Sequence, residues 1–223
     1  EISECLVGSE MCIRDRNSFE TDLKRAFGSL HFWAGLLLEC VILFRSGFDS
    51  DLFRISVPVL ASVPYSTAWI NEYQSGYLKE YLPRCGRNAY ILGKFFSCGI
   101  SGGALPGIAC FFYLHSKTQE EVSVDVFLVF LSGMLWAVVA ATLAAASNSR
   151  YVAYGGSFVL FHALVILYER YFASLYCLYP VEWFAPAHIW VFGNTGIILM
   201  CGGMILVVCI IYYEILRRCI ERV

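Results

Sequence analysis

The sequence predicts an all-α, polytopic membrane protein with six transmembrane helices and both termini in the cytoplasm. Of its 223 residues, 58% are hydrophobic and 15% are charged, whereas soluble proteins average about 45–50% and about 25%. A soluble domain could not hide so many apolar side chains, so the excess is expected to face a lipid bilayer. The net charge of −2 also argues against a nucleic acid as a partner, because it does not attract phosphate backbones.

Six apolar stretches are candidates for the membrane spans. They cover residues 27–44, 55–70, 89–114, 124–147, 151–168 and 194–213. A helix needs about 20 residues to cross a hydrocarbon layer of about 30 Å, so the shorter two need support from interfacial residues at their ends. Helices are expected because a backbone in lipid must satisfy its polar groups within its own segment.

The basic residues between these stretches set the expected orientation. With the N-terminus inside, the external connections hold Arg45, Arg54, Lys117 and Arg170. The internal segments then hold Lys24, Arg25, Lys79, Arg84, Arg87, Lys94, Arg150, Arg217, Arg218 and Arg222. Because cytoplasmic loops retain Lys and Arg, this asymmetry predicts a multi-pass protein of the cell membrane with both ends inside.

The first 16 residues read unlike the rest of the chain. They contain no apolar core of signal-peptide length. Residues 6–16, LVGSEMCIRDR, resemble the translation of a transposon-based sequencing adapter. We therefore expect 1–16 to be a non-native, adapter-derived leader, with a short polar leader as the alternative, and 17–223 to form one six-helix transmembrane domain.

Metal and catalytic chemistry find little support in the sequence. The ten cysteines include no Cys-x-x-Cys pair and several lie inside apolar runs, where a cysteine behaves as a small hydrophobic residue. The four histidines are scattered without the spacing of metal ligands. No nucleophile–base motif is present either. We expect no metal, no cofactor and no catalytic residue, which makes a membrane-embedded enzyme the third choice of function.

The polar segment 71–94 is the most informative part of the chain. Tyr77, Leu78, Tyr81 and Leu82 are spaced to share one face of a short helix, and Pro83 ends it. Such an amphipathic helix lies on a membrane surface or docks into a groove of a partner. The alternative is a solvated loop with an incidental helical turn.

The same segment resembles a known family. Its pattern is similar to the E-x-x-x-G-x-L, R-x-x-R and Y-x-x-x-K stretch of membrane permeases of the ABC type-2 exporter family. The residues that match are Glu72, Gly76, Leu78, Arg84, Arg87, Tyr90 and Lys94. With the six-span topology, the resemblance covers 17–223. It implies that segment 71–94 contacts an ATPase and transmits its closure, with Glu72, Gly76, Leu78, Arg84, Arg87 and Lys94 as coupling residues.

The resemblance also implies the protein's activity and partners. The chain would be a bacterial-type permease subunit that moves an unknown substrate by alternating access. It would work with a second copy or a relative and with two ABC ATPase subunits, in a lipid bilayer. The alternative is a non-transporting membrane protein, such as an immunity or scaffold factor that occupies a partner transporter.

The sequence offers no nucleotide site of its own. Gly93-Lys94 is followed by Phe95, where a phosphate-binding loop needs Ser or Thr for magnesium. The run Ile100-Ser101-Gly102-Gly103 lies in an apolar stretch, where small residues allow helices to pack closely. ATP hydrolysis is therefore expected in a separate chain.

Two further features have both a functional and a structural interpretation. The aromatic segment 169–193 is expected to form an outer interfacial or re-entrant segment, as in the resembled family, or an aromatic belt that anchors the sixth span. Glu39, inside the first span, is a candidate for the substrate pathway or a dimer interface, because a membrane-embedded carboxylate seldom faces lipid. The alternative is a glutamate hydrogen-bonded within one subunit. For His162, in the fifth span, packing is favoured over transport.

Overall fold

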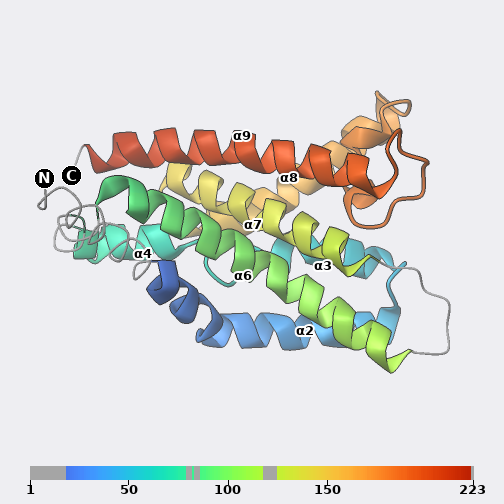
Figure 1. Ribbon diagram of the computed structural model, residues 1–223, viewed down its shortest axis with the longest axis horizontal. Helices are drawn as coiled ribbons and strands as arrows, with labels where there is room; N and C mark the ends of the chain where they lie inside the picture. Colours follow the sequence, from blue (N-terminus) through green and yellow to red (C-terminus); the bar gives the residue numbers. More distant parts are fainter. Residues whose placement is uncertain (1–18, 79–81, 83–85, 118–124, 222–223) are drawn as a thin grey trace, which may run out of the picture.

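The structure is a computed structural model that describes residues 19–78, 82, 86–117 and 125–221, and their regular secondary structure is entirely helical. The helices form one elongated bundle (Figure 1). Residues 171–193 lie at one end of it, and α4 and the C-terminal end of α9 lie at the other. The expected all-α class is confirmed.

The elements follow one another along the chain with few interruptions. A helical segment, Phe19–Phe27, precedes the first labelled helix at a bend of 52°. The helices are α2 (Leu30–Ser46), α3 (Asp51–Leu60), α4 (Ala68–Gln74), α6 (Arg87–Ser116), α7 (Val126–Ser147), α8 (Arg150–Arg170) and α9 (Asn194–Ile220), with the 3₁₀ helices η1 (Tyr176–Leu178) and η2 (Pro180–Trp183). Side-chain caps begin three of them: Ser29, Ser50 and Asp125 accept hydrogen bonds from backbone N–H groups of α2, α3 and α7.

Four described helices are long and apolar enough to cross a membrane: α6, α7, α8 and α9. The bent pair of Phe19–Phe27 and α2 gives a fifth candidate if it counts as one span. Large apolar side chains, among them Leu37, Val159 and Leu206, are exposed on α2, α8 and α9. Their exposure suits contact with lipid, and the fold indicates a multi-pass membrane protein.

The second apolar stretch does not form the continuous helix expected over 55–70. The helix α3 has ten residues, about 15 Å and half of a hydrocarbon layer of about 30 Å. Residues 61–67 then form turns before α4 begins. Pro58 and Pro64 lack an N–H group, and the hydroxyls of Ser62 and Ser66 donate to backbone carbonyls. Most of this turn is buried in protein, the setting in which irregular backbone is tolerated at membrane depth.

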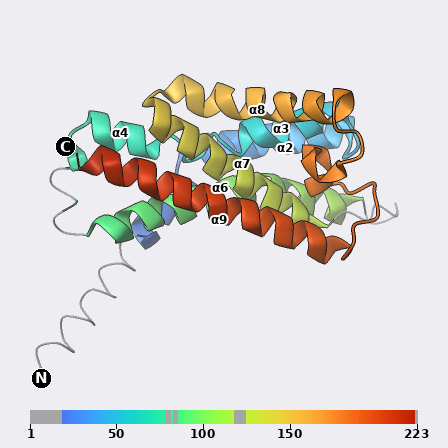
Figure 2. The same ribbon diagram turned by 90° about the horizontal axis from the view of Figure 1, so that it is seen from above.

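The centre of the bundle is the pair α6 and α7, with α8 along one edge and α9 lying over α7 (Figure 2). Glycines let the central pair approach closely. A Cβ atom on Gly103 would lie 2.5 Å from the carbonyl oxygen of Phe130, and one on Gly133 would lie 2.6 Å from Cγ of Pro106. This contact confirms that the run 100–103 serves close helix packing.

Candidate functional site

A buried lysine joins three elements at the end of the bundle where α4 lies. Lys94, on the second turn of α6, is 2% exposed at its side chain. Its Nζ atom lies 2.7 Å from Oδ1 of Asp22 and 2.6 Å from Oε1 of Glu72. Asp22 belongs to Phe19–Phe27 and Glu72 to α4. Because an unpaired buried charge is costly, these contacts fasten the three elements to one another.

Two tyrosines complete what we call the Lys94 cluster: Asp22, Tyr65, Glu72, Tyr90 and Lys94. The Tyr65 hydroxyl accepts from Lys94 Nζ at 2.9 Å and donates to Asp22 Oδ1 at 2.8 Å. The Tyr90 hydroxyl donates to Glu72 Oε2 at 2.6 Å. Lys94 Nζ also lies 5.0 Å from the centre of the Tyr65 ring and 5.5 Å from that of Tyr90, within the range of cation–π attraction.

Arg25 brings a second cation to the edge of the Lys94 cluster. Its Nη1 atom lies 3.5 Å from Glu72 Oε1, and its guanidinium lies over the ring of Tyr77. The two cations therefore balance the charges of Asp22 and Glu72. The second oxygen of Asp22, Oδ2, is nevertheless buried without a hydrogen-bond partner among the described residues, so the cluster is not fully satisfied.

The structure brings two of the predicted coupling residues, Glu72 and Lys94, into direct contact. Leu78 is buried in the helical residues after α4, and Gly76 has the positive φ of 74° that the turn between them requires. Arg87 is exposed at the first residue of α6. Arg84 and Tyr81 lie outside the described residues, so only part of the expected amphipathic helix can be placed.

Asp22 and Tyr65 could not be selected for this site from the sequence. Asp22 lies among basic residues in a polar lead-in, and Tyr65 lies in a run expected to be helical. Their contacts with Lys94 span 72 and 29 positions of the chain. Local patterns carry no information on such pairs.

Glu39 lies inside the chain, where α2 meets α3. Its side chain is fully buried, and Oε1 accepts a hydrogen bond from the Ser56 hydroxyl at 3.0 Å. Oε2 has no partner among the described residues. The position favours the interpretation of a glutamate that is hydrogen-bonded within one subunit.

The segment 169–193 folds back onto the bundle through η2. Trp183 stacks on Trp136 of α7, with ring centres 5.7 Å apart. The buried carboxylate of Glu182 accepts from the backbone N–H groups of Ala187 and His188 at 3.1–3.2 Å and lies 2.8 Å from Nδ1 of His188. Sequence reasoning missed this carboxylate as the anchor of the segment.

The remaining candidates do not gather into a second chemical site. His162 contacts the carbonyl oxygen of Phe158 in its own helix at 3.3 Å, as a packing histidine does. Across the described ranges, no three His, Cys, Asp or Glu side chains are arranged to hold a metal ion. Among the described residues, the buried charged side chains thus form ion pairs and hydrogen bonds and do not form a metal site.

The fold and the Lys94 cluster define a class of protein. It is a helical, multi-pass membrane protein in which buried ion pairs hold Phe19–Phe27, α4 and α6 together at one end. Comparison with known proteins does not narrow that class. No family model, no curated protein and no solved structure matches the chain.

Proposed function

We propose that the chain is the permease subunit of an ABC type-2 transporter, an exporter that moves its substrate by alternating access. A separate ATPase supplies the energy. The observation that carries the proposal is the contact of Glu72 with Lys94 and, through Lys94, with Asp22. This contact links the segment expected to meet the ATPase with two helical segments that enter the bundle.

The Lys94 cluster gives a path for mechanical coupling. A force on α4 moves Glu72, and the buried ion pairs resist separation, since breaking such a pair costs about 3–5 kcal/mol. Lys94 therefore moves with Glu72, and so does Asp22 on the segment before α2. The helix α6 continues for 30 residues against α7, so a shift of its first turns reaches the opposite end.

The distribution of basic residues supports a cytoplasmic location for this end of the bundle. This end holds the segment Phe19–Phe27, the starts of α6 and α8 and the end of α9, to which Lys24, Arg25, Arg87, Lys94, Arg150, Arg217 and Arg218 belong. The other end holds α3 and the ends of α2, α6 and α8, to which Arg54, Arg45, Lys117 and Arg170 belong. In the six-span arrangement, Phe19–Phe27 with α2 is the first crossing, α3 with its buried turn and α4 is a broken second, and α6 to α9 are the other four.

Co-purification with an ABC ATPase tests the proposal. We expect two copies of the ATPase, together with this chain and a second copy or a relative, and ATP hydrolysis that depends on the assembled complex. In reconstituted vesicles, E72Q is expected to assemble but to lose most substrate-dependent hydrolysis. The matched control is E214Q, because Glu214 is exposed on α9.

Two results would contradict this function. The first is that the folded chain binds no ATPase. If the chain then lowered the activity of a complete transporter, it would be an immunity or scaffold factor. The other concerns coupling alone: E72A and R84A variants that assemble and hydrolyse ATP as the parent complex does would remove segment 71–94 from the coupling path.

A further inference from the structure

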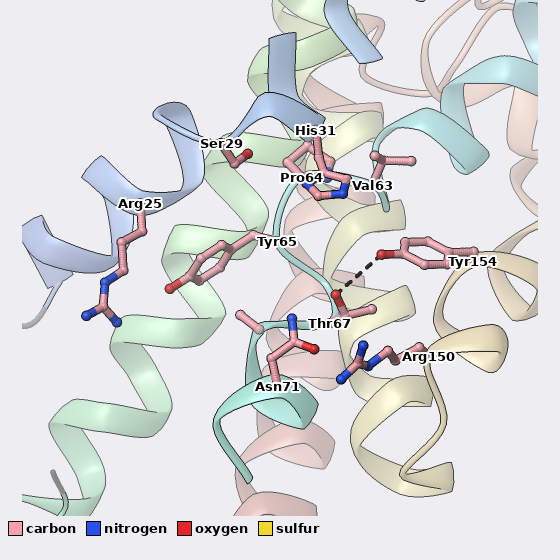
Figure 3. Close-up of a pocket in the computed structure, with 11 residues that line it drawn as sticks. Arg25, Ser29, His31, Val63, Pro64, Tyr65, Thr67, Asn71, Arg150 and Tyr154 are labelled. Carbon is pink, nitrogen blue, oxygen red and sulfur yellow. Dashed lines mark hydrogen bonds between the residues drawn. The ribbon is translucent and has the colours of Figure 1, made fainter. Parts of the chain in front are cut away.

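A pocket of about 320 Å³ opens on the side of the bundle beside the Lys94 cluster. Its lining comes from segments that are far apart in the sequence (Figure 3). The polar side chains among its lining residues include Arg25, Tyr65, Thr67, Asn71, Arg150 and Tyr154. We call this cavity the lateral pocket.

The lateral pocket exists because α3 is short. That helix ends at Leu60, and the chain then turns through residues 61–67, so Val63 and Pro64 form part of the wall. His31 of α2 and Tyr154 of α8 line it from two helices that each contact α3. One or two turns further along the same helices, Leu38 and Phe158 are 49% and 39% exposed. Apolar side chains suited to contact with acyl chains are therefore exposed one or two helical turns from the pocket.

The charge of the lateral pocket is positive. Its charged lining side chains are Arg25 and Arg150, and none of the lining residues is a carboxylate. Arg25 is paired with Glu72 at 3.5 Å, so the excess positive charge is that of Arg150. Arg150 donates to the side-chain oxygen of Gln74 at 2.8 Å but makes no ion pair with a carboxylate of the described chain. Its charge is therefore left uncompensated, which favours an anion nearby.

Neutral hydrogen-bonding groups stand beside the two arginines. The hydroxyls of Thr67 and Tyr154 lie 3.3 Å apart. In the view of Figure 3, the Asn71 side chain lies between these hydroxyls and Arg25. Guanidinium groups bind phosphate oxygens with two parallel hydrogen bonds, and hydroxyl and amide donors can occupy the remaining oxygens. This set of groups matches a phosphate ester.

We propose that the lateral pocket binds the phosphate group of an anionic glycerophospholipid, whose acyl chains lie along the exposed apolar side chains of α2 and α8. Bound there, the headgroup joins Phe19–Phe27, α4 and the start of α8, next to the Lys94 cluster. A ligand that binds this arrangement more tightly than any other stabilises it. The proposal does not depend on the transport function.

Lipid binding to the purified full chain in neutral detergent tests this proposal. The probes are dioleoylphosphatidylglycerol and dioleoylphosphatidylcholine, with the dissociation constant from native mass spectrometry and the Tm as a second measure. We expect the anionic lipid to bind at least about ten-fold more tightly, and R150Q to remove about that factor, in line with the strength of hydrogen bonds between charged groups.

The chain provides a matched control, because α8 begins with Arg150 and ends with Arg170. R170Q is expected to bind the anionic lipid as the parent protein does. If R150Q proves unstable, the T67V/Y154F double variant tests the same pocket without a change of charge, and a weaker affinity for both phospholipids is expected. The proposal is overturned if R150Q keeps the parent affinity, or if the two lipids bind equally.

Inorganic phosphate distinguishes a lipid from a soluble source of the same group. Without acyl chains, a large excess of it is expected to raise the Tm far less than the anionic lipid does. Stabilisation by inorganic phosphate that equals the effect of the lipid, and is lost in R150Q, would contradict the lipid and assign the pocket to a soluble phosphate ester.

Discussion

Three buried charged residues differ in how their partners compensate them. Lys94 has two carboxylates within 2.7 Å, and Glu182 accepts hydrogen bonds from backbone N–H groups. Glu39 accepts one hydroxyl, from Ser56. Glu39 was evident in the sequence because it interrupts an apolar run, and Lys94 because it completes a motif. The roles of Glu182 and Asp22 were not evident in the sequence, because turns and long-range contacts determine their partners.

Removal of the Lys94 charge should destabilise the protein. In K94M, Asp22 loses its cation and Glu72 keeps only the longer ion pair with Arg25, and we expect the free energy of unfolding to fall by about 3–5 kcal/mol. In K24M, which removes an exposed lysine paired with Glu20, we expect a change below about 1 kcal/mol. Denaturation in detergent micelles measures both. Equal stability of the two variants would show that the buried pairs contribute nothing.

A triple variant separates charge compensation from packing at the same site. D22N/E72Q/K94M replaces all three charges by neutral groups, which for buried ion pairs is often nearly neutral in free energy. It is therefore expected to recover much of the stability that K94M loses. If it is as unstable as K94M, side-chain packing rather than charge dominates the site.

Substitution of Glu39 tests its two interpretations. Gln keeps an acceptor for the Ser56 hydroxyl, whereas Ala removes it and leaves a cavity. We expect E39A to lose about 2–3 kcal/mol of stability and E39Q much less. In a transport assay, a pathway role predicts that Ala alters transport while Gln is better tolerated. Equal transport by the parent and both variants would rule out the pathway role.

Among the elements, hydropathy located the long helices well and failed at α3. The expected stretches 89–114, 124–147 and 151–168 became Arg87–Ser116, Val126–Ser147 and Arg150–Arg170, because a long apolar run is itself the requirement for a span. The stretch 55–70 is apolar as well, but its prolines and serines redirect the backbone. Whether such a run stays helical depends on the protein around it.

The packing of α6 on α7 should be sensitive to a single methyl group. In G103A, the added Cβ would lie 2.5 Å from the carbonyl oxygen of Phe130, so the helices must separate, at a cost of about 1–3 kcal/mol. In G203A on α9, no atom lies within 4 Å of the added Cβ, and no loss is expected. The test is the Tm of each purified variant, compared with that of the parent protein. Equal Tm values for G103A and G203A would mean that the helices accommodate the methyl group.

Most of the basic residues and the aromatic segment 169–193 belong to elements at opposite ends of the bundle (Figure 1). Basic residues gather around α4 and the end of α9, whereas Tyr176, Trp183 and Trp190 lie in the segment between α8 and α9. This polarity underlies the proposed orientation. The number of crossings depends on how α3 and the turn that follows it are placed in the bilayer.

Cysteine labelling in intact cells tests this orientation. Cys177 is exposed in η1, and a membrane-impermeant maleimide is expected to label it from outside. In a C177S background that labelling should vanish. In the same background, R218C, at the far end of α9, should add to the labelling only after permeabilisation. The reverse pattern would place α4 outside the cell.

The sequence alone determined that the chain is apolar enough for a lipid bilayer and that it is helical. It also located most of the long helices and singled out one polar segment, 71–94. It could do so because hydropathy and charge are properties of neighbouring residues. Only the tertiary structure decided that α3 ends early, that Asp22 and Tyr65 join Lys94 and Glu72, and that two arginines line a pocket beside them. Each of these depends on groups distant in the chain, whose contacts arise when helix packing excludes water and buried charges must find partners.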